Sequence, residues 1–192
     1  MSASKGSSFE REICKQLSTW WSKGIEGAAR DDVFWRSSQS GGRATQRAKF
    51  GKRTSGSYGD INAVDPIGQP LLRYFTFELK RGRSHGLPAD LIDCKPTKKV
   101  RPFEKALVQA LTAAELAGSF TWALICKPDR REVMIYLPTI HARQFIVRRP
   151  PVVYSLLVNP AETRYVFAGW LFRTFLKLVK PADIAKAVKA PL

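Results

Sequence analysis

The sequence predicts a single α/β domain built around a mixed central sheet. Three observations lead to this prediction. The chain has 192 residues, a length that suits one domain. Apolar residues make up 44% of it and aromatics 11%, which supplies a hydrophobic core and excludes bulk disorder. The apolar pattern also alternates between helix and strand periods, in the order helix, three strands, helix, two strands.

The first predicted element is a helix over residues 7–21. Ser7 and Glu10 have the spacing of a capping box. At 100° per residue, Glu10 falls inside an apolar arc of about 140°, whereas Glu12 falls on the polar side. The arc contains Phe9, Ile13, Cys14, Leu17, Trp20 and Trp21. A carboxylate on the buried side of a helix is unusual, which makes Glu10 a candidate functional residue. Alternatively, Glu10 only caps the helix together with Ser7.

Three strands are predicted next, over residues 33–36, 58–64 and 71–80. The segment 65–70 has turn composition, which predicts a hairpin between the second and third strands. Because side chains alternate along a strand, Glu78 and Lys80 share one face of the third strand. The opposite face carries Phe75, Phe77 and Leu79.

A long segment over residues 37–59 separates the first two strands. It is rich in Gly and Ser, it contains no acidic residue, and we expect it to be a flexible loop. Its basic residues are Arg43, Arg47, Lys49, Lys52 and Arg53.

The second half begins with a predicted helix over 103–117, which Gly118 ends as a C-cap. Strands follow over 122–126 and 133–137, joined by a turn at 128–131. We expect residues 1–140 to form the main domain. Residues 141–192 are predicted to be a basic C-terminal extension packed on the same domain, with helices over 171–179 and 181–188.

Positive charge dominates the composition. Lys and Arg number 32 against 16 Asp and Glu, so the net charge is +16 and the isoelectric point is about 10.2. Such a surplus predicts a polyanionic partner, most often nucleic acid. No apolar stretch approaches the ~18 residues of a membrane helix, and no apolar leader is recognisable at the N-terminus. Three widely spaced cysteines favour neither disulfides nor a zinc site, so we expect a cytoplasmic protein without membrane contact.

Two carboxylates and a lysine carry the predicted chemistry. Asp60 precedes Glu78 by eighteen residues, and Lys80 follows two residues later. If their strands pair, Asp60 lies beside Glu78 on one face of the sheet and forms a hard oxygen site that suits Mg²⁺. Lys80 could then hold the attacking water or offset charge on a phosphoryl transition state. Alternatively, Asp60 is a turn residue, and Glu78 and Lys80 form an ordinary ion pair.

The set Asp60, Glu78-x-Lys80 resembles the motif of the PD-(D/E)xK nuclease superfamily, with Gly59 where many members have proline. The segment 5–12, which reads Lys-Gly-Ser-Ser-Phe-Glu-Arg-Glu, is similar to the opening of archaeal-type Holliday junction resolvases. In those enzymes the first glutamate of the Glu-Arg-Glu triplet joins the metal site, and Glu10 matches it. They also have an arginine at the end of the first strand, which Arg36 matches.

The resemblance covers about residues 5–137 and implies a restriction-endonuclease-like core. It implies a metal site of Asp60, Glu78 and Glu10 that takes Mg²⁺ or Mn²⁺. It also implies a homodimer that cuts branched DNA in recombination or repair. The loop before Asp60 is longer than in the archaeal enzymes, and the last ~50 residues have no counterpart there.

The leading hypothesis is therefore a Mg²⁺-dependent DNA endonuclease that acts on branched DNA. Its DNA contacts are expected from Arg11, Arg36 and the basic residues of the 37–59 loop. It would act in the cytoplasm, either at the nucleoid or as a virus-encoded enzyme in its host. The alternatives are a nuclease for other duplex DNA of restriction or repair type, a basic nucleic-acid-binding protein without catalysis, and an inactive nuclease fold that serves in an assembly.

Overall fold

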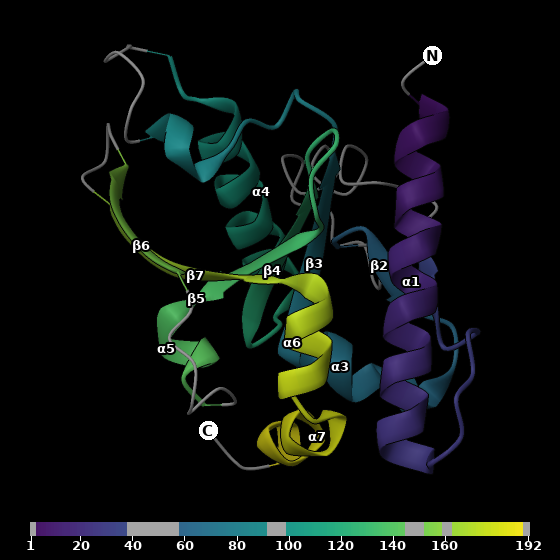
Figure 1. Ribbon diagram of the computed structural model, residues 1–192. Coiled ribbons are helices and arrows are strands. Elements are labelled where there is room, and N and C mark those ends of the chain that lie inside the picture. Colours follow the sequence, from purple (N-terminus) through teal and green to yellow (C-terminus); the bar gives the residue numbers. More distant parts are fainter. Residues whose placement is uncertain (1–2, 38–57, 92–98, 145–151, 159–162, 190–192) are drawn as a thin grey trace.

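The computed structural model describes residues 3–37, 58–91, 99–144, 152–158 and 163–189. A five-stranded sheet lies at its centre, in the order β3-β4-β5-β7-β6 (Figure 1). Its strands are β3 (Phe75–Arg81), β4 (Thr121–Lys127), β5 (Met134–Pro138), β6 (Val152–Val158) and β7 (Thr163–Leu171). Strands β3 and β4 are parallel, and all other neighbours are antiparallel. The predicted α/β class with a mixed sheet is confirmed.

Helices cover both faces of this sheet. Helix α1 (Ala3–Glu26) packs with Phe75, Phe77 and Leu79 on one side, and α4 (Pro102–Ala117) packs on the other side against Leu124 and Cys126. The first side is completed by α6 (Phe172–Leu178) and α7 (Pro181–Lys189). Alternation along β3 therefore places its aromatic residues against α1, as the sequence predicts.

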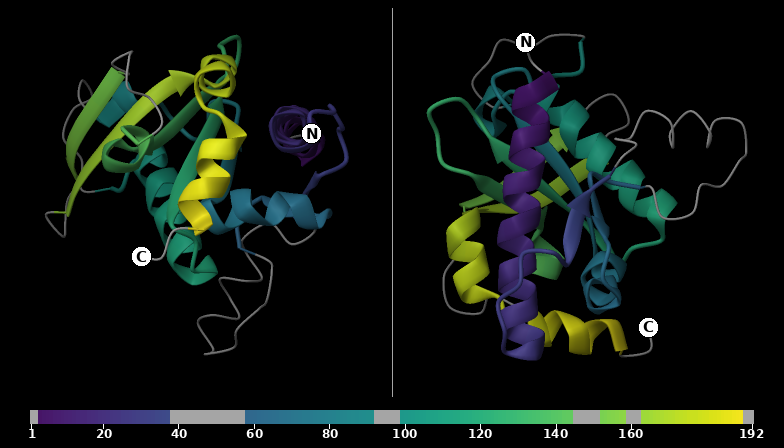
Figure 2. Two further views of the ribbon diagram at one scale, coloured as in Figure 1. Left: turned by 90° about the horizontal axis from the view of Figure 1, so that it is seen from below. Right: turned by 90° about the vertical axis from the view of Figure 1, so that its right-hand side faces the viewer.

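Helix α1 is longer at both ends than the predicted 7–21. It begins at Ala3, so Ser7 lies inside the helix and the predicted capping box at Ser7 is wrong. Residues 3–6 contain no proline to stop the helix, and the Arg11 guanidinium donates to the Ser7 hydroxyl one turn back, at 3.5 Å. The indole of Trp20 donates to the Val179 carbonyl at 3.2 Å, which connects α1 to the residues just before α7. Figure 2 shows α7 next to the last turns of α1.

The hairpin in the first half of the chain is not the predicted one. Strand β1 (Phe34–Arg36) pairs antiparallel with β2 (Ile61–Ala63), with Arg36 opposite Ile61. Between β2 and β3 the chain forms a 3-10 turn, η1 (Pro66–Gly68), and helix α3 (Gln69–Tyr74).

Residues 71–74 are therefore helical, and their prediction as a strand is wrong. The physical reason lies just before them. The Asp65 carboxylate accepts the N–H of Ile67 at 3.0 Å, and Pro66 occupies the first position, which together start the 3-10 turn that leads into α3.

The second half follows its prediction more closely. Helix α4 ends at Gly118, which is left-handed with φ 67°. Strand β4 extends the predicted one by one residue at each end, β5 is shifted by one residue from its prediction, and the predicted turn joins them.

Beyond Pro138, the short helix α5 (Thr139–Ala142) precedes β6 and β7, which the sequence did not predict as strands. Strand β7 pairs with β5, so residues 163–171 belong to the central sheet. Helices α6 and α7 match the two helices predicted in this region. The division at residue 140 stays a prediction. Among the described helices, none has the length and apolar character needed to cross a membrane.

Candidate active site

Asp60 is held against the edge strand β3 by two hydrogen bonds. Its N–H donates to the Phe77 carbonyl at 2.8 Å, and its carboxylate accepts the N–H of Leu79 at 2.7 Å. Only 7% of Asp60 is exposed. Gly59 permits this approach because its φ is +81°, and a Cβ there would lie 2.8 Å from the Phe77 carbonyl oxygen. The Gly-Asp pair therefore fixes a buried carboxylate beside β3.

Glu78 and Lys80 project from β3 on the α4 side of the sheet. The Lys80 ammonium donates to the Glu78 carboxylate at 2.6 Å, and Glu78 is 9% exposed. An ammonium has no lone pair while it is protonated, so Lys80 cannot be a metal ligand in that state. Asp60, Glu78 and Lys80, the three residues of the predicted motif, therefore lie together. The Lys80 ammonium is bound to the Glu78 carboxylate and not to that of Asp60.

The two carboxylates repel one another. Burial, followed by the negative charge of Glu78, raises the pKa of Asp60 to about 7. The Leu79 N–H and the Lys80 charge oppose this effect only in part. Two buried carboxylates that repel one another favour a hard cation that neutralises both.

The donor set fits Mg²⁺ better than a softer metal. Both donors are carboxylate oxygens, and Mg²⁺ is commonly held by one or two carboxylates together with water and substrate phosphate. Within the described ranges, no three His, Cys, Asp or Glu side chains are grouped so that they could hold a metal. Asp60 and Glu78 would hold such an ion through their carboxylate oxygens.

Glu10 lies next to this pair but has its own cationic neighbour. Its carboxylate is 3.8 Å from the Arg36 guanidinium, at the end of β1. Its charge raises the pKa of Asp60, and after burial it is the largest cause that raises the pKa of Cys14 to about 12. Glu10 therefore faces the site, as its place on the helix predicts, while its role as a metal ligand stays a prediction.

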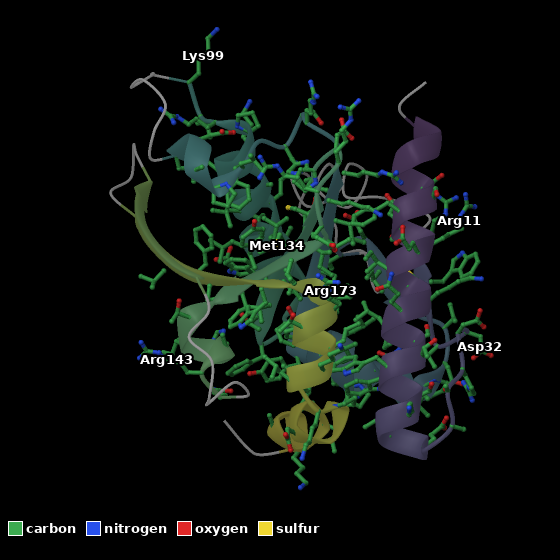
Figure 3. The ribbon with its side chains drawn as sticks, in the orientation of Figure 1. Arg11, Asp32, Lys99, Met134, Arg143 and Arg173 are labelled. Atoms are coloured by element: carbon green, nitrogen blue, oxygen red, sulfur yellow. The ribbon has the colours of Figure 1, made fainter. Side chains whose placement is uncertain are left out.

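The predicted DNA contacts separate into three groups. Arg36 lies at the site, and Arg11 is exposed on α1, away from the sheet (Figure 3). The loop residues lie outside the described residues; they are Arg43, Arg47, Lys49, Lys52 and Arg53. The base of that loop is described, because the Ser37 N–H donates to the Asp60 carbonyl at 2.8 Å. The loop thus leaves and rejoins the fold beside the candidate site.

Sequence reasoning missed Lys127 as a neighbour of the site. Its ammonium lies 3.5 Å from the Glu12 carboxylate and 6.0 Å from the centre of the Phe9 ring, one residue before Glu10. Strand register explains its position, since Arg81 pairs with Lys127 and Lys80 with Cys126. The pattern of the single strand could not have revealed this, because the register between β3 and β4 is set by packing of both strands.

Comparison with known proteins gives one finding. A family model described as "Phage putative PDDEXK endonuclease" matches residues 1–186. No curated protein and no solved structure matches the chain. The family model spans the Asp60, Glu78 and Lys80 positions together with β7, α6 and most of α7.

Proposed function

The chain belongs to the family described as "Phage putative PDDEXK endonuclease", and we propose that it is a Mg²⁺-dependent endonuclease that cleaves branched DNA such as a four-way Holliday junction. The family supports a nuclease that acts on DNA. Metal identity, branched substrate and a homodimer are our proposals. The observation that carries the proposal is the buried pair Asp60 and Glu78, with Lys80 bound to Glu78 at 2.6 Å.

Each residue of the site has a distinct role in this proposal. Asp60 and Glu78 hold the ion, and a bound divalent ion supplies Lewis-acid activation of water and neutralises phosphate charge. Lys80 orients the water or stabilises negative charge on the phosphate. Glu10 completes or orients the site, and Arg36 binds phosphate. Mn²⁺ replaces Mg²⁺ because both take oxygen ligands.

The branched substrate and the dimer are proposed together. They rest on the resemblance of residues 5–12 and Arg36 to archaeal-type resolvases. A four-way junction is cut on two strands related by symmetry, which suits two copies of one chain. Such an enzyme would work in the cytoplasm, during recombination or repair of the DNA it meets there.

The test is cleavage by the purified full chain. Four-way junction, linear duplex and single strand of equal length are each incubated with Mg²⁺, Mn²⁺ or EDTA. We expect cleavage that needs metal and favours the junction. Asp60→Asn and Glu78→Ala should abolish it and leave DNA binding largely intact. Asp31→Asn and Glu115→Ala are matched controls at exposed carboxylates and should cleave normally.

Other outcomes separate the alternatives. Wild-type turnover by Asp60→Asn or Glu78→Ala would remove these residues from the catalytic role. Equal cutting of junction and duplex by a monomer in sedimentation would favour a restriction or repair nuclease. DNA binding without any cleavage would favour a non-catalytic basic protein.

A further inference from the structure

The turn between β4 and β5 has an unusual backbone. Arg130 has φ 58°, and it is the one non-glycine residue with a positive φ among the described residues. The left-handed region crowds the Cβ of an ordinary residue against the backbone, so Gly, Asn or Asp usually occupies it. The Arg131 N–H donates to the Pro128 carbonyl at 3.1 Å and closes the turn. Arg130, with its long basic side chain, therefore occupies a left-handed position that favours a small residue.

Charged residues beside this turn are paired with other elements. Lys127 lies 3.5 Å from Glu12 on α1, Asp129 lies 3.8 Å from Arg83 after β3, and Glu132 lies 3.7 Å from Arg173 on α6. In contrast, Arg130 and Arg131 are exposed, and neither has an ion pair within the described parts of the chain. The turn is thus fastened at its base and presents two unneutralised guanidinium groups.

The turn lies at the catalytic end of the sheet, where α1 begins (Figure 1). Lys80 pairs with Cys126, and neighbouring strands are about 5 Å apart. Arg130 follows Cys126 by four residues, a span of at most about 14 Å. Asp60 and the base of the 38–57 loop lie at the other edge of β3. The candidate site therefore lies between that loop base and the β4–β5 turn.

We propose that Arg130 and Arg131 form a second DNA contact, which grips the phosphate backbone beside the scissile phosphate. This inference rests on the proposed nuclease function. The partner is a DNA backbone, because planar guanidinium groups match phosphate oxygens in paired hydrogen bonds. The contact carries no base specificity, since it reaches phosphates and not base edges. The contact fixes the position of the cleaved DNA strand relative to Lys80.

The test measures binding of full-length protein to labelled DNA in EDTA, across a range of salt concentrations. Each phosphate contact contributes about −0.9 to the slope of log K against log salt. The double variant Arg130→Ala with Arg131→Ala should flatten this slope by up to about 2 and weaken binding to all sequences alike. The matched control is Arg73→Ala with Arg143→Ala, which removes the same charge from exposed positions on α3 and after α5. The control should leave the slope unchanged.

A single variant separates contact from folding. Arg130→Gly suits the left-handed backbone, so its denaturation midpoint should be no lower than that of the wild type. Its salt slope should nevertheless flatten by about 0.9. Equal weakening by both double variants, or an unchanged slope in the turn variant, would overturn the proposal.

The two levels of the proposal fail in different ways. If the turn variant binds like the wild type while Asp60→Asn still abolishes cleavage, the contact is wrong and the nuclease stands. If wild-type protein does not cleave any DNA with metal, the proposed function itself is wrong.

Discussion

The two ends of the central sheet differ in the polar side chains that they contain. At one end, Asp60 and Glu78 are buried as neighbouring acids, with Lys80 as the nearby cation. At the other end, three pairs of polar side chains form hydrogen bonds without a carboxylate. These pairs are Thr76 with Ser119 at 2.8 Å, Thr121 with His141 at 2.6 Å, and Tyr74 with Gln144 at 2.8 Å.

This difference separates stability from function. A neutral hydrogen-bonded pair adds modestly to the free energy of unfolding. Two neighbouring buried carboxylates lower it, because burial removes water from both groups and their charges repel one another. A protein retains such a cost where the charges act on a ligand or substrate. We therefore propose that the carboxylate end is the functional end and that the neutral end serves the fold.

The strongest test of this comparison removes Lys80. We expect Lys80→Ala to lower the single-turnover cleavage rate about 100- to 1000-fold, because a positioned cation at the phosphate is lost. Binding of Mn²⁺, measured by titration calorimetry, should persist. Lys105→Ala, at an exposed position on α4, is the control and should cleave normally. If Mn²⁺ binding collapsed in Lys80→Ala, the role assigned to this lysine would be wrong.

Asp60→Asn should stabilise the protein, and more so as the pH rises. The pKa of Asp60 is raised from 3.8 to about 7, so the folded protein retains a proton that the unfolded chain releases between these values. Wild-type stability from this group is present below pH 3.8 and is lost as pH rises through 7. The gain in Asp60→Asn should therefore be larger at pH 8 than at pH 5, by a few kcal/mol at most. Urea unfolding at pH 5 and pH 8 measures it, and a gain independent of pH would contradict the assignment.

Gly59→Ala should destabilise the carboxylate end by about 3 kcal/mol in urea unfolding, because it adds left-handed strain to a clash with the Phe77 carbonyl. Gly27 is a matched control. Its φ is +80°, but a Cβ there meets nothing within 4 Å. Gly27→Ala should cost only about 1 kcal/mol. If both variants lost the same free energy of unfolding, the close approach of Gly59 to β3 would not be the cause of the loss.

The smallest effect is expected at the neutral end. Thr121→Val keeps the shape of a buried β4 side chain and removes the partner of His141, so it should cost about 1 kcal/mol at pH 8. Thr112→Val, at an exposed position on α4, should be near neutral. Cleavage by Thr121→Val should match the wild type, and a large loss of activity would break the division between the two ends.

Local patterns in the sequence sufficed where the cause was local. The helical arc around Glu10, the Gly118 C-cap and the alternation along β3 all depend on residues close in the chain, and the structure agrees with them. The closeness of Asp60 to Glu78 was predicted through a hairpin that does not form. It arises instead from two hydrogen bonds between Asp60 and β3, which no sequence period encodes.

The missed elements depend on distant partners. Strand β7 pairs with β5, and β6 pairs with β7. Both segments are rich in β-branched and aromatic residues, which favour strands, but only this pairing places them in the central sheet. Residues 71–74 are apolar enough for a strand, but the helix start at Asp65 and Pro66 decides their conformation. The DNA-binding roles of the 37–59 loop and of Arg11 stay predictions.

The bond from Trp20 to Val179 also bears on how the chain is made. The two residues are 159 positions apart. A ribosome that adds about 5–20 residues per second therefore makes Trp20 roughly 8–30 seconds before its acceptor. During that interval the last turns of the first helix lack the cover that α6 and α7 later provide. Newly made chains thus carry an open apolar stripe until late in translation, and the nuclease is completed only when residues near 180 have emerged.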